Sequence, residues 1–396
     1  MVFCDPMFKD KFFGRKKYFK REFILKQVNE RKGITQDLYE RSLNGLEYLS
    51  QLRNMEFNPI FKGGSAVQLL IPGDIQRLSI DIDLSINSTE QEIVSVLEKI
   101  HERFDRKIYK FEKVAEPLPK VILYNLFIPS YFSETPSRIQ LDFHLHEPSY
   151  ATQQTPIKTF LYESDYIVRT PTVDALIGDK LTVLGPETIG KPMIERPVQI
   201  AKQIYDIYIL LNLSSNFNEI FDAYFDVFKF EKENRNKPDL TFEEVIDDLV
   251  SVCKYLCIYN SIPNWLENNY IRHKCSFLKR GIEGLSTFTS RKLNLNFYKA
   301  RLISGKIAFL AKLMLNKFEK ILTKSIPIEA FHQDNLKIVN LIQDSNLIDK
   351  IIKKLDHLKQ EERFHLSFGE MRRTNPRGLL FWFGYYFPTD FLELIL

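Results

Sequence analysis

The sequence predicts an α+β protein in which a mixed β-sheet flanked by helices is followed by an all-α helical bundle. Two stretches, residues 78–86 and 138–146, alternate apolar and polar side chains, which is the period of a strand with one buried face. From residue 216 onward apolar residues recur at helical spacing between short loops, which is typical of an antiparallel bundle. We therefore predict two domains, residues 1–215 and residues 216–396.

The composition is that of a large globular protein. Of its 396 residues, 44% are hydrophobic and 32 are phenylalanine, so the chain has enough apolar material for two cores. This composition excludes a disordered chain, and the lack of an apolar run of bilayer length excludes a membrane protein. The four cysteines show no metal-ligand spacing and the N-terminus lacks a signal-peptide run, so we expect reduced thiols and a cytoplasmic location.

Basic residues are concentrated in two stretches, although the whole chain carries a net charge of only +4. Residues 291–324 contain nine lysines and arginines against one acid, Glu319, and residues 8–21 contain seven against Asp10. Such stretches suit a polyanion such as RNA, and a solvated helix face is the alternative explanation.

Periodicity and capping residues predict the order of the elements. Helices are expected over residues 15–31, 35–55, 88–104, 173–184 and 198–213, and strands over residues 78–86, 109–114, 120–132, 138–146 and 166–170. Bundle helices are expected over residues 241–259, 296–322, 335–342 and 347–363. The helix over residues 35–55 is expected to pack behind strand 78–86. The aromatic run 378–387 is short and contains glycines, which favours a core helix or a partner interface over a membrane span.

The functional interpretation depends on Lys62-Gly63-Gly64-Ser65, followed by Asp81-Ile82-Asp83. Asp81 and Asp83 fall on the polar face of the predicted strand, roughly 7 Å apart along the chain. Both carboxylates can therefore bind one Mg²⁺, which takes oxygen ligands and is usually held by one or two carboxylates plus substrate phosphates. Gly64 and Ser65 are expected to hold those phosphates, because glycine lets the backbone approach and the N-terminus of the following helix favours an anion.

Each half of this motif also has a purely structural explanation. Asp-x-Asp on an amphipathic strand is most often the solvated face of a sheet, and Gly-Gly is most often a turn. The two halves together, in this order and with fifteen residues between Ser65 and Asp81, favour a cleft in which a metal ion and a phosphate meet.

The segments Phe61-Lys62-Gly63-Gly64-Ser65-Ala66 and Ser79-Ile80-Asp81-Ile82-Asp83-Leu84 resemble the polymerase-β-like nucleotidyltransferase superfamily, and more narrowly the AbiEii/AbiGii-type nucleotidyltransferase toxins. The resemblance covers residues 35–215, so residues 1–215 are expected to form a nucleotidyltransferase domain. It implies an enzyme that uses a nucleoside triphosphate (NTP) and Mg²⁺. Such proteins look like toxins of bacterial toxin-antitoxin or abortive-infection systems, and some family members modify the acceptor end of tRNA.

The resemblance implies two further active-site residues. A lysine in a Glu-Lys-Leu-like segment matches Lys180, and an aspartate that closes an Arg-Asp-x-Tyr-Asp-like segment matches Asp206. Lys180 would offset triphosphate charge, and Asp206 would orient that lysine or the acceptor. The chain departs from the pattern at Lys202, which replaces the arginine, and at Gln203, which replaces the first aspartate. A surface lysine and a Lys202–Asp206 helix ion pair are the structural alternatives.

Asp142 is the candidate for a third carboxylate, because it lies on the polar face of the predicted strand 138–146. A third acid in the cleft would help to hold the metal ion or would accept a proton from the attacking hydroxyl group. An ordinary exposed strand aspartate is the alternative. His144 and His146 share this face, but no further ligands of a soft-metal site accompany them.

These observations lead to one principal hypothesis and two alternatives. The principal hypothesis is a Mg²⁺-dependent enzyme that transfers a nucleoside monophosphate from an NTP to an acceptor hydroxyl group, with RNA such as tRNA as the acceptor and a cognate antitoxin protein as a partner. The first alternative is a nucleotidyltransferase-like binding module that acts on a protein through its helical bundle. The second is transfer to a small molecule.

Overall fold

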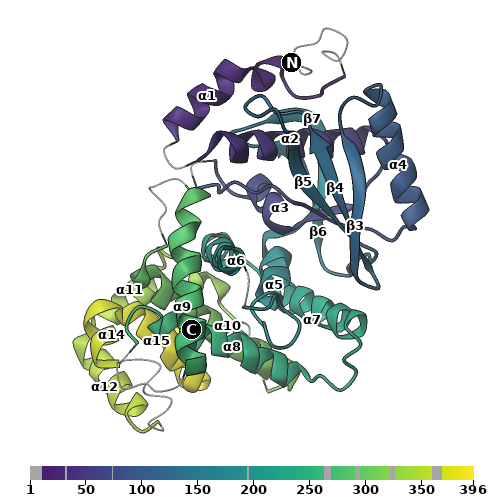
Figure 1. Ribbon diagram of the computed structural model, residues 1–396. Coiled ribbons are helices and arrows are strands. Elements are labelled where there is room, and N and C mark those ends of the chain that lie inside the picture. Colours follow the sequence, from purple (N-terminus) through teal and green to yellow (C-terminus); the bar gives the residue numbers. More distant parts are fainter. Residues whose placement is uncertain are drawn as a thin grey trace. The chain divides into compact units, whose positions relative to one another are not determined.

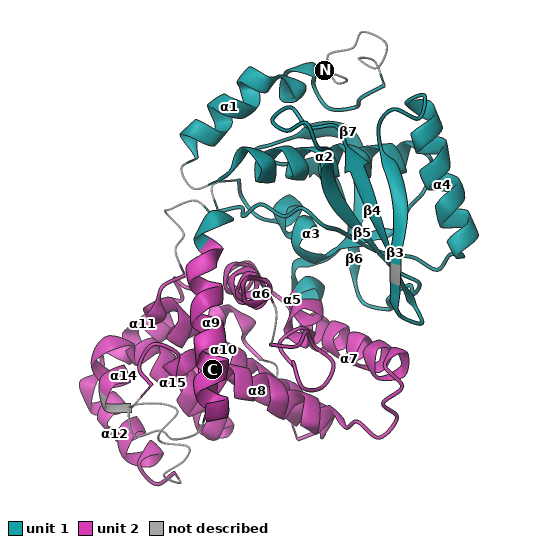
Figure 2. Ribbon diagram, viewed as in Figure 1, with its two compact units in different colours: residues 1–176, 286–294 teal, residues 177–285, 295–396 magenta. Residues whose placement is uncertain are grey.

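The computed structural model describes residues 11–31, 34–73, 75–193, 196–262, 269–289, 295–321, 326–358 and 368–396. The chain divides into two compact units (Figure 2). Unit 1 comprises residues 1–176 and 286–294, and unit 2 comprises residues 177–285 and 295–396. The domain boundary expected at residue 215 marks the end of the family resemblance, and it stays a prediction.

Unit 1 contains the sheet and the helices that pack on it (Figure 1). Its helices are η2 (Lys16–Phe19), α1 (Arg21–Glu30), α2 (Gln36–Asn54), α3 (Gly63–Leu70) and α4 (Glu90–Arg103). Its strands are β1 (Ile60–Lys62), β2 (Ile82–Ser85), β3 (Lys110–Leu118), β4 (Val121–Ile128), β5 (Ser137–His144), β6 (Thr152–Lys158) and β7 (Glu163–Pro171). Helix α5 (Val173–Thr182) begins in unit 1 and ends in unit 2.

The described strands of unit 1 form one sheet with the order β3-β4-β5-β2-β1-β7-β6. Strand β2 runs antiparallel to β1 and parallel to β5, and β1 runs parallel to β7. The outer neighbours β3 and β4, β4 and β5, and β6 and β7 are antiparallel. The sheet is therefore mixed, and the α+β fold class is confirmed.

Helices α2 and α4 bury their apolar stripes against one face of this sheet. A single hydrophobic cluster contains leucines of α2, apolar residues of α4, and the alternate residues of β2 and β5 that point the same way: Leu43, Leu46, Leu49, Ile93, Leu97, Ile82, Leu84, Leu141 and Phe143. A Cβ atom on Gly45 of α2 would lie 3.7 Å from Ile82. Helix α2 thus packs behind β2, and the polar residues of β2 point to the other face.

The strand predicted over residues 78–86 is shorter in the structure, where β2 spans Ile82–Ser85. The segment before it pairs with side chains instead of a strand, because the hydroxyl groups of Ser42 and Ser65 donate to the carbonyls of Ser79 and Asp81. Alternation of polar and apolar residues predicts an extended chain with one buried face, but it does not reveal whether a neighbouring strand is present.

Strand β6 has no counterpart among the predicted elements. Its sequence is polar and contains Pro156, so no strand period is visible. The strand lies at the edge of the sheet, where a proline is tolerated because its missing N–H breaks no hydrogen bond to a second neighbour.

The regular secondary structure among the described residues of unit 2 is helical. Its helices are α6 (Pro197–Leu210), α7 (Phe217–Asn234), α8 (Phe242–Ile258), α9 (Asn269–Gly284), α10 (Phe297–Phe318), η5 (Ile328–Phe331), α11 (Leu336–Gln343), α12 (Ser345–Leu355), α14 (Phe368–Thr374), α15 (Pro376–Tyr386) and α16 (Pro388–Ile395). Thr241, Asn296 and Asn335 cap α8, α10 and α11 through their side chains. This result confirms the expected helical C-terminal region.

The aromatic run 378–387 forms most of α15 and belongs to the core of unit 2. Leu379, Leu380, Phe381 and Trp382 are fully buried, and α15 packs on α10 and α16. Burial of this run favours the core interpretation over a partner interface. No described helix has the length and apolar character needed to cross a membrane.

Some of the described basic residues of the stretch 291–324 are buried inside unit 2. The side chains of Arg301 and Lys306 are 2% and 0% exposed. Arg301 donates to the carbonyl of Cys257 (3.0 Å) and to the Glu370 carboxylate (2.9 Å), and Lys306 donates to the carbonyl of Phe331. These two basic side chains therefore contact the bundle interior and are not available to an external polyanion, and burial lowers the pKa of Lys306 to about 7. The ends of the stretch, residues 291–294 and 322–324, lie outside the described residues.

A buried carboxyl group forms hydrogen bonds that hold the N-terminal segment of unit 1 against the core. Glu47 of α2 is 0% exposed and accepts hydrogen bonds from the amide of Gly14 (3.0 Å), the amide of Phe13 (3.2 Å) and the hydroxyl group of Tyr162 (2.8 Å). Burial raises the pKa of Glu47 to about 7, against the opposing effect of these donors.

This burial predicts a pH-dependent contribution to stability. Because the folded-state pKa of Glu47 lies above its ordinary value, the folded protein binds the extra proton between about pH 4.5 and 7. Stability from this group is therefore present at low pH and is lost as the pH rises to about 7, by about 3 kcal/mol. Urea unfolding of the wild type and Glu47→Gln at pH 5, 6, 7 and 8 measures this effect. The wild type should lose stability relative to the variant as the pH rises, and parallel pH profiles would contradict the prediction.

Candidate active site

The Gly-Gly-Ser turn lies where β1 ends and α3 begins. Helix α3 starts at Gly63, two residues before Ser65, and the side chain of its N-cap residue, Lys62, makes no capping hydrogen bond. The first amide groups of a helix have no partner within the helix and attract anions. This end of α3 therefore has the properties of a phosphate site, as the glycines predict.

Gly63 allows the Asp83 carboxylate to lie directly against this turn. The φ angle of Gly63 is +70°, a conformation that side chains rarely adopt, and a Cβ atom there would lie 1.8 Å from Asp83 Oδ2. The contact is close because β1 and β2 pair with Lys62 opposite Asp83. A carboxylate and the N-terminus of a helix thus meet at one point.

Asp142 lies next to Asp83 on the neighbouring strand. The parallel pairing of β2 and β5 places Asp83 opposite Asp142, and adjacent strands are about 4.8 Å apart. Both side chains are half-buried and point away from the face covered by α2, because their neighbours Ile82, Leu84 and Leu141 point into that core. The Gln140 amide donates to Asp142 Oδ1 (2.7 Å) and orients this carboxylate.

Asp81 lies just before β2 and is exposed. Its carbonyl accepts a hydrogen bond from the hydroxyl group of Ser65, which is 4% exposed. The Ser65 side chain therefore positions the backbone of Asp81. Ser65 remains able to meet a phosphate only through its backbone amide at the start of α3.

The oxygen donors at this point suit a hard divalent cation. Asp83, Asp142 and Asp81 supply carboxylates without a competing thiolate or imidazole directly between them, which is the donor set that Mg²⁺ prefers. The described residues contain no preformed group of three or more His, Cys, Asp or Glu side chains that could hold a metal ion. One or two of these carboxylates would thus need substrate phosphates to complete a metal site.

Arg77 adds a positive charge beneath the turn, and sequence analysis did not single it out. It is 2% exposed, and its guanidinium lies so close to Gly64 that a Cβ atom there would be 2.5 Å from Nη2. Arg77 Nη1 donates to the carbonyl of Leu78 (3.1 Å). A single arginine beside a stretch of alternating residues forms no periodic pattern in the sequence, so the position of Arg77 next to Gly64 is visible only in the fold.

Lys180 and Asp206 meet inside unit 2. Lys180 Nζ lies 2.7 Å from Asp206 Oδ2 and also donates to Gln203 Oε1 (3.0 Å). The side chains of Lys180 and Asp206 are 2% and 0% exposed, so neither is the surface residue of the structural alternative. Gln203, the departure from the family pattern, provides a neutral oxygen to the lysine where an aspartate would provide a charged one.

The contact between Gly63 and Asp83 can be tested by a double-mutant cycle. Gly63→Ala forces a Cβ atom into the carboxylate and a side chain into a positive φ angle, and we expect a loss of about 1–3 kcal/mol of stability. Asp83→Ala removes the clash between the Cβ atom and the carboxylate, but it does not remove the strain of a side chain at a positive φ angle. Chemical denaturation of the four proteins should therefore show a smaller cost of Gly63→Ala in the Asp83→Ala background, and equal costs would argue against the contact.

The Lys180–Asp206 pair predicts a large asymmetry between single and double substitutions. Asp206→Ala leaves a buried ammonium group without its carboxylate and should cost about 3–5 kcal/mol. Replacement of both residues, Lys180→Met with Asp206→Leu, should cost much less because no buried charge remains. The free energy of unfolding measures both effects, and a single substitution that costs under about 1 kcal/mol would show that the pair is solvated.

One protein-family model matches this chain, over residues 52–251, and its description is "Nucleotidyl transferase AbiEii toxin, Type IV TA system". The match spans 200 residues, slightly more than half of the 396, and includes the Gly-Gly-Ser turn, Asp81, Asp83, Asp142, Lys180 and Asp206. No curated protein matches the chain significantly.

Solved structures with some similarity include two from Helicobacter pylori. One, described as a suspected nucleotidyltransferase, is 12% identical, covers 72% of this chain and 97% of its own, and has a TM-score of 0.36. The other, JHP933, is 13% identical, covers 72% of this chain and 99% of its own, and has a TM-score of 0.32. These TM-scores are too low to support any inference.

Proposed function

Because the chain belongs to the AbiEii family of nucleotidyltransferase toxins, we propose that it transfers a nucleoside monophosphate from an NTP to a hydroxyl group of RNA, with Mg²⁺ as its cofactor. The observation that carries this proposal is that Asp83 lies against the first residue of α3 and that Asp142 lies opposite Asp83 on the next strand. Carboxylates for a cation and amide groups for phosphates are the two requirements of a metal–triphosphate site.

In the proposed reaction the acceptor oxygen attacks the α-phosphorus. A new bond forms between these two atoms, the bond from the α-phosphorus to the bridging oxygen breaks, and pyrophosphate leaves. Asp142 accepts the proton of the acceptor hydroxyl group, because Gln140 holds its carboxylate in place beside Asp83. The chain's task is mainly to position the groups and to offset the developing charge.

The phosphates are bound at the Gly-Gly-Ser turn. The amides of Gly64 and Ser65 hold phosphate oxygens, and the buried Arg77 adds positive charge beneath them. Asp81 and Asp83 would hold Mg²⁺, which supplies charge neutralisation and a template for the triphosphate when it is bound. Asp83 is the better placed of the two, since its carboxylate lies against Gly63.

Lys180 and Asp206 complete the proposed set of functional residues. The family resemblance implies that both take part in the reaction, and within unit 2 Asp206 holds the lysine in a fixed orientation at 2.7 Å. The double variant Lys180→Met/Asp206→Leu removes both roles without leaving a buried charge, and it is therefore the right protein for testing catalysis separately from folding.

The family description also suggests the biological setting. A type IV toxin-antitoxin assignment implies a cognate antitoxin protein, and RNA such as tRNA is the acceptor that we propose. The family assignment favours an enzyme over a binding module without catalytic activity.

Transfer can be tested with Mg²⁺, each α-³²P-labelled NTP in turn, and total bacterial tRNA, followed by a denaturing gel. We expect label on RNA with the wild type and a loss of at least about 100-fold in Asp81→Ala and Asp83→Asn. Asp165→Asn is the matched control, because Asp165 is an exposed aspartate on β7 of the same unit, and it should transfer normally. Label on protein instead of RNA would contradict the proposed acceptor, and label that persists in both site variants would contradict the proposed site.

A further inference from the structure

A group of basic side chains lies on the surface of unit 1, outside the candidate active site. Within residues 15–22 five lysines and arginines accompany a single acid, Glu22, and all five are exposed: Arg15, Lys16, Lys17, Lys20 and Arg21. We call residues 15–21 the basic segment; it comprises η2, its flanking residues and the start of α1. Arg15 also forms an ion pair with Glu163 (2.8 Å). In contrast to Arg301 and Lys306, these cations can meet an external polyanion.

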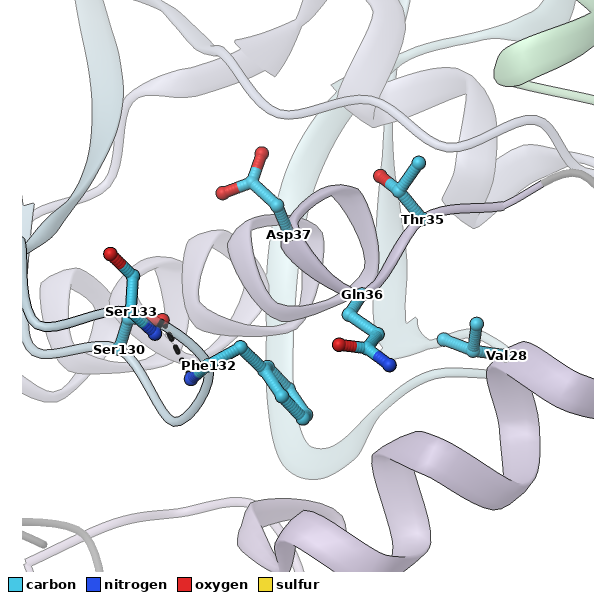
Figure 3. Close-up of a pocket in the computed structure, with 7 residues that line it drawn as sticks. All are labelled: Val28, Thr35, Gln36, Asp37, Ser130, Phe132 and Ser133. Atoms are coloured by element: carbon cyan, nitrogen blue, oxygen red, sulfur yellow. Dashed lines mark hydrogen bonds between the residues drawn. The ribbon is translucent and has the colours of Figure 1, made fainter.

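Figure 3 shows a pocket of about 480 Å³, and Phe132, one of its lining residues, lies next to Arg21 of the basic segment. Its lining combines one aromatic ring, one amide, three hydroxyl groups, one carboxylate and one aliphatic side chain, from Phe132, Gln36, Thr35, Ser130, Ser133, Asp37 and Val28. Figure 3 shows the ring of Phe132 and the amide of Gln36 next to each other, one from the loop between β4 and β5 and one from the start of α2. A flat ring next to a donor–acceptor amide matches the face and the edge of a nucleobase.

The basic segment and the pocket form one continuous surface. The guanidinium carbon of Arg21 lies 5.4 Å from the centroid of the Phe132 ring, and the hydroxyl group of Tyr131 donates to the carbonyl of Phe19. A ligand whose base stacks on Phe132 would therefore place its phosphates near Arg21 and the lysines that precede it. Arginine also stabilises stacked bases through its planar cation.

The loop that carries Phe132 is held in place before any ligand arrives. Buried Glu40 accepts hydrogen bonds from the Ser130 hydroxyl group (2.6 Å) and the Tyr131 amide (2.6 Å). The Ser130 oxygen in turn accepts a hydrogen bond from the amide of Phe132 (3.0 Å). The acidic Asp37 of the pocket is offset by Arg41, 3.4 Å away. A preorganised loop loses less conformational entropy on binding.

The sheet relates this pocket to the candidate active site. Strands β2 and β5 are parallel with Ile82 opposite Leu141, so the residues before each strand lie at the same end of the sheet. β5 begins at Ser137, four residues before Leu141, which puts the loop roughly 13 Å beyond the level of Ile82. The pocket is on the α2 side, whereas Asp83 points to the opposite face. A nucleotide bound in the pocket is therefore not the one that reacts.

We propose that the basic segment and this pocket bind a single-stranded stretch of the acceptor RNA, with the phosphates on Lys17, Lys20 and Arg21 and one base stacked on Phe132. This inference rests on the proposed function, because it names where the RNA acceptor is held. The combination of an aromatic face, an amide and adjacent cations fits RNA better than an acidic protein, which needs the cations but not the ring.

The first experiment measures binding of a fluorescently labelled twelve-nucleotide single-stranded RNA to the full chain by anisotropy, without NTP, at several salt concentrations. The triple variant Lys17→Glu/Lys20→Glu/Arg21→Glu should lose at least tenfold in affinity, and its log–log salt slope should fall by about 2, since each phosphate contact contributes about 0.7. The matched control is Lys337→Glu/Lys350→Glu/Lys353→Glu, which reverses three exposed lysines of α11 and α12. Equal effects of the two triple variants would overturn the proposal.

The second experiment separates stacking from charge at Phe132. Phe132→Leu keeps an apolar side chain without an aromatic face and should weaken RNA binding by about 5- to 150-fold, whereas Phe132→Tyr keeps the face and should bind as the wild type does. Thermal unfolding of both variants verifies that the loop still folds. Equal affinities for Phe132→Leu and the wild type would overturn the stacking site.

The outcomes also separate this inference from the proposed function. RNA labelling by the wild type together with unchanged RNA binding in the basic-segment variant would overturn the docking surface and leave the nucleotidyltransferase proposal intact. Labelling of a protein without RNA binding would overturn both the RNA acceptor and this surface. Loss of binding to a purified acidic protein, with RNA binding unchanged, would assign the surface to a protein partner and overturn the RNA site.

Discussion

The close contact between Gly63 and the Asp83 carboxylate is the constraint on which the candidate site depends. Only a residue without a Cβ atom fits there, since that atom would lie 1.8 Å from Asp83 Oδ2. The contact brings a carboxylate to the N-terminus of α3, and the pairing of β2 with β5 then adds Asp142. The start of α3 and the strands β2 and β5 thus bring together the two requirements of a metal–triphosphate complex: carboxylates for the cation and amide groups for the phosphates.

The structure uses several charged side chains internally, and this changes how the basic residues of the sequence are interpreted. Arg77 lies beneath the turn, and Arg301 and Lys306 bind carbonyls inside the bundle. Buried basic groups of this kind need fixed hydrogen-bond partners, because an unpaired polar group or charge in the interior is costly. The cations of residues 15–21 are exposed, which is why we propose RNA binding there, whereas Arg301 and Lys306 of the stretch 291–324 are buried.

Much of the fold and part of the site could be predicted from the sequence. Alternation identified β5, the leucine stripe identified α2, and the glycines with Asp83 identified the turn and its partner strand. Other features could not be predicted, because they depend on neighbours in space. The pairing of β2 begins only at Ile82. The polar sequence of β6, with Pro156, shows no strand period. Arg77 lies next to Gly64 because of the path that the chain takes between α3 and β2. Local patterns report burial and periodicity, but they do not report which groups meet.

The most direct test of the site is calorimetric titration of NTP into the protein with and without Mg²⁺, for the wild type and Asp83→Asn. If Asp83 and the N-terminus of α3 form one metal–triphosphate site, the wild type should bind NTP more tightly when Mg²⁺ is present. Asp83→Asn should lose that enhancement and keep the weaker, metal-independent binding to the helix N-terminus. An equal Mg²⁺-dependent enhancement in both proteins would contradict the assignment of Asp83, and with it the proposed active site.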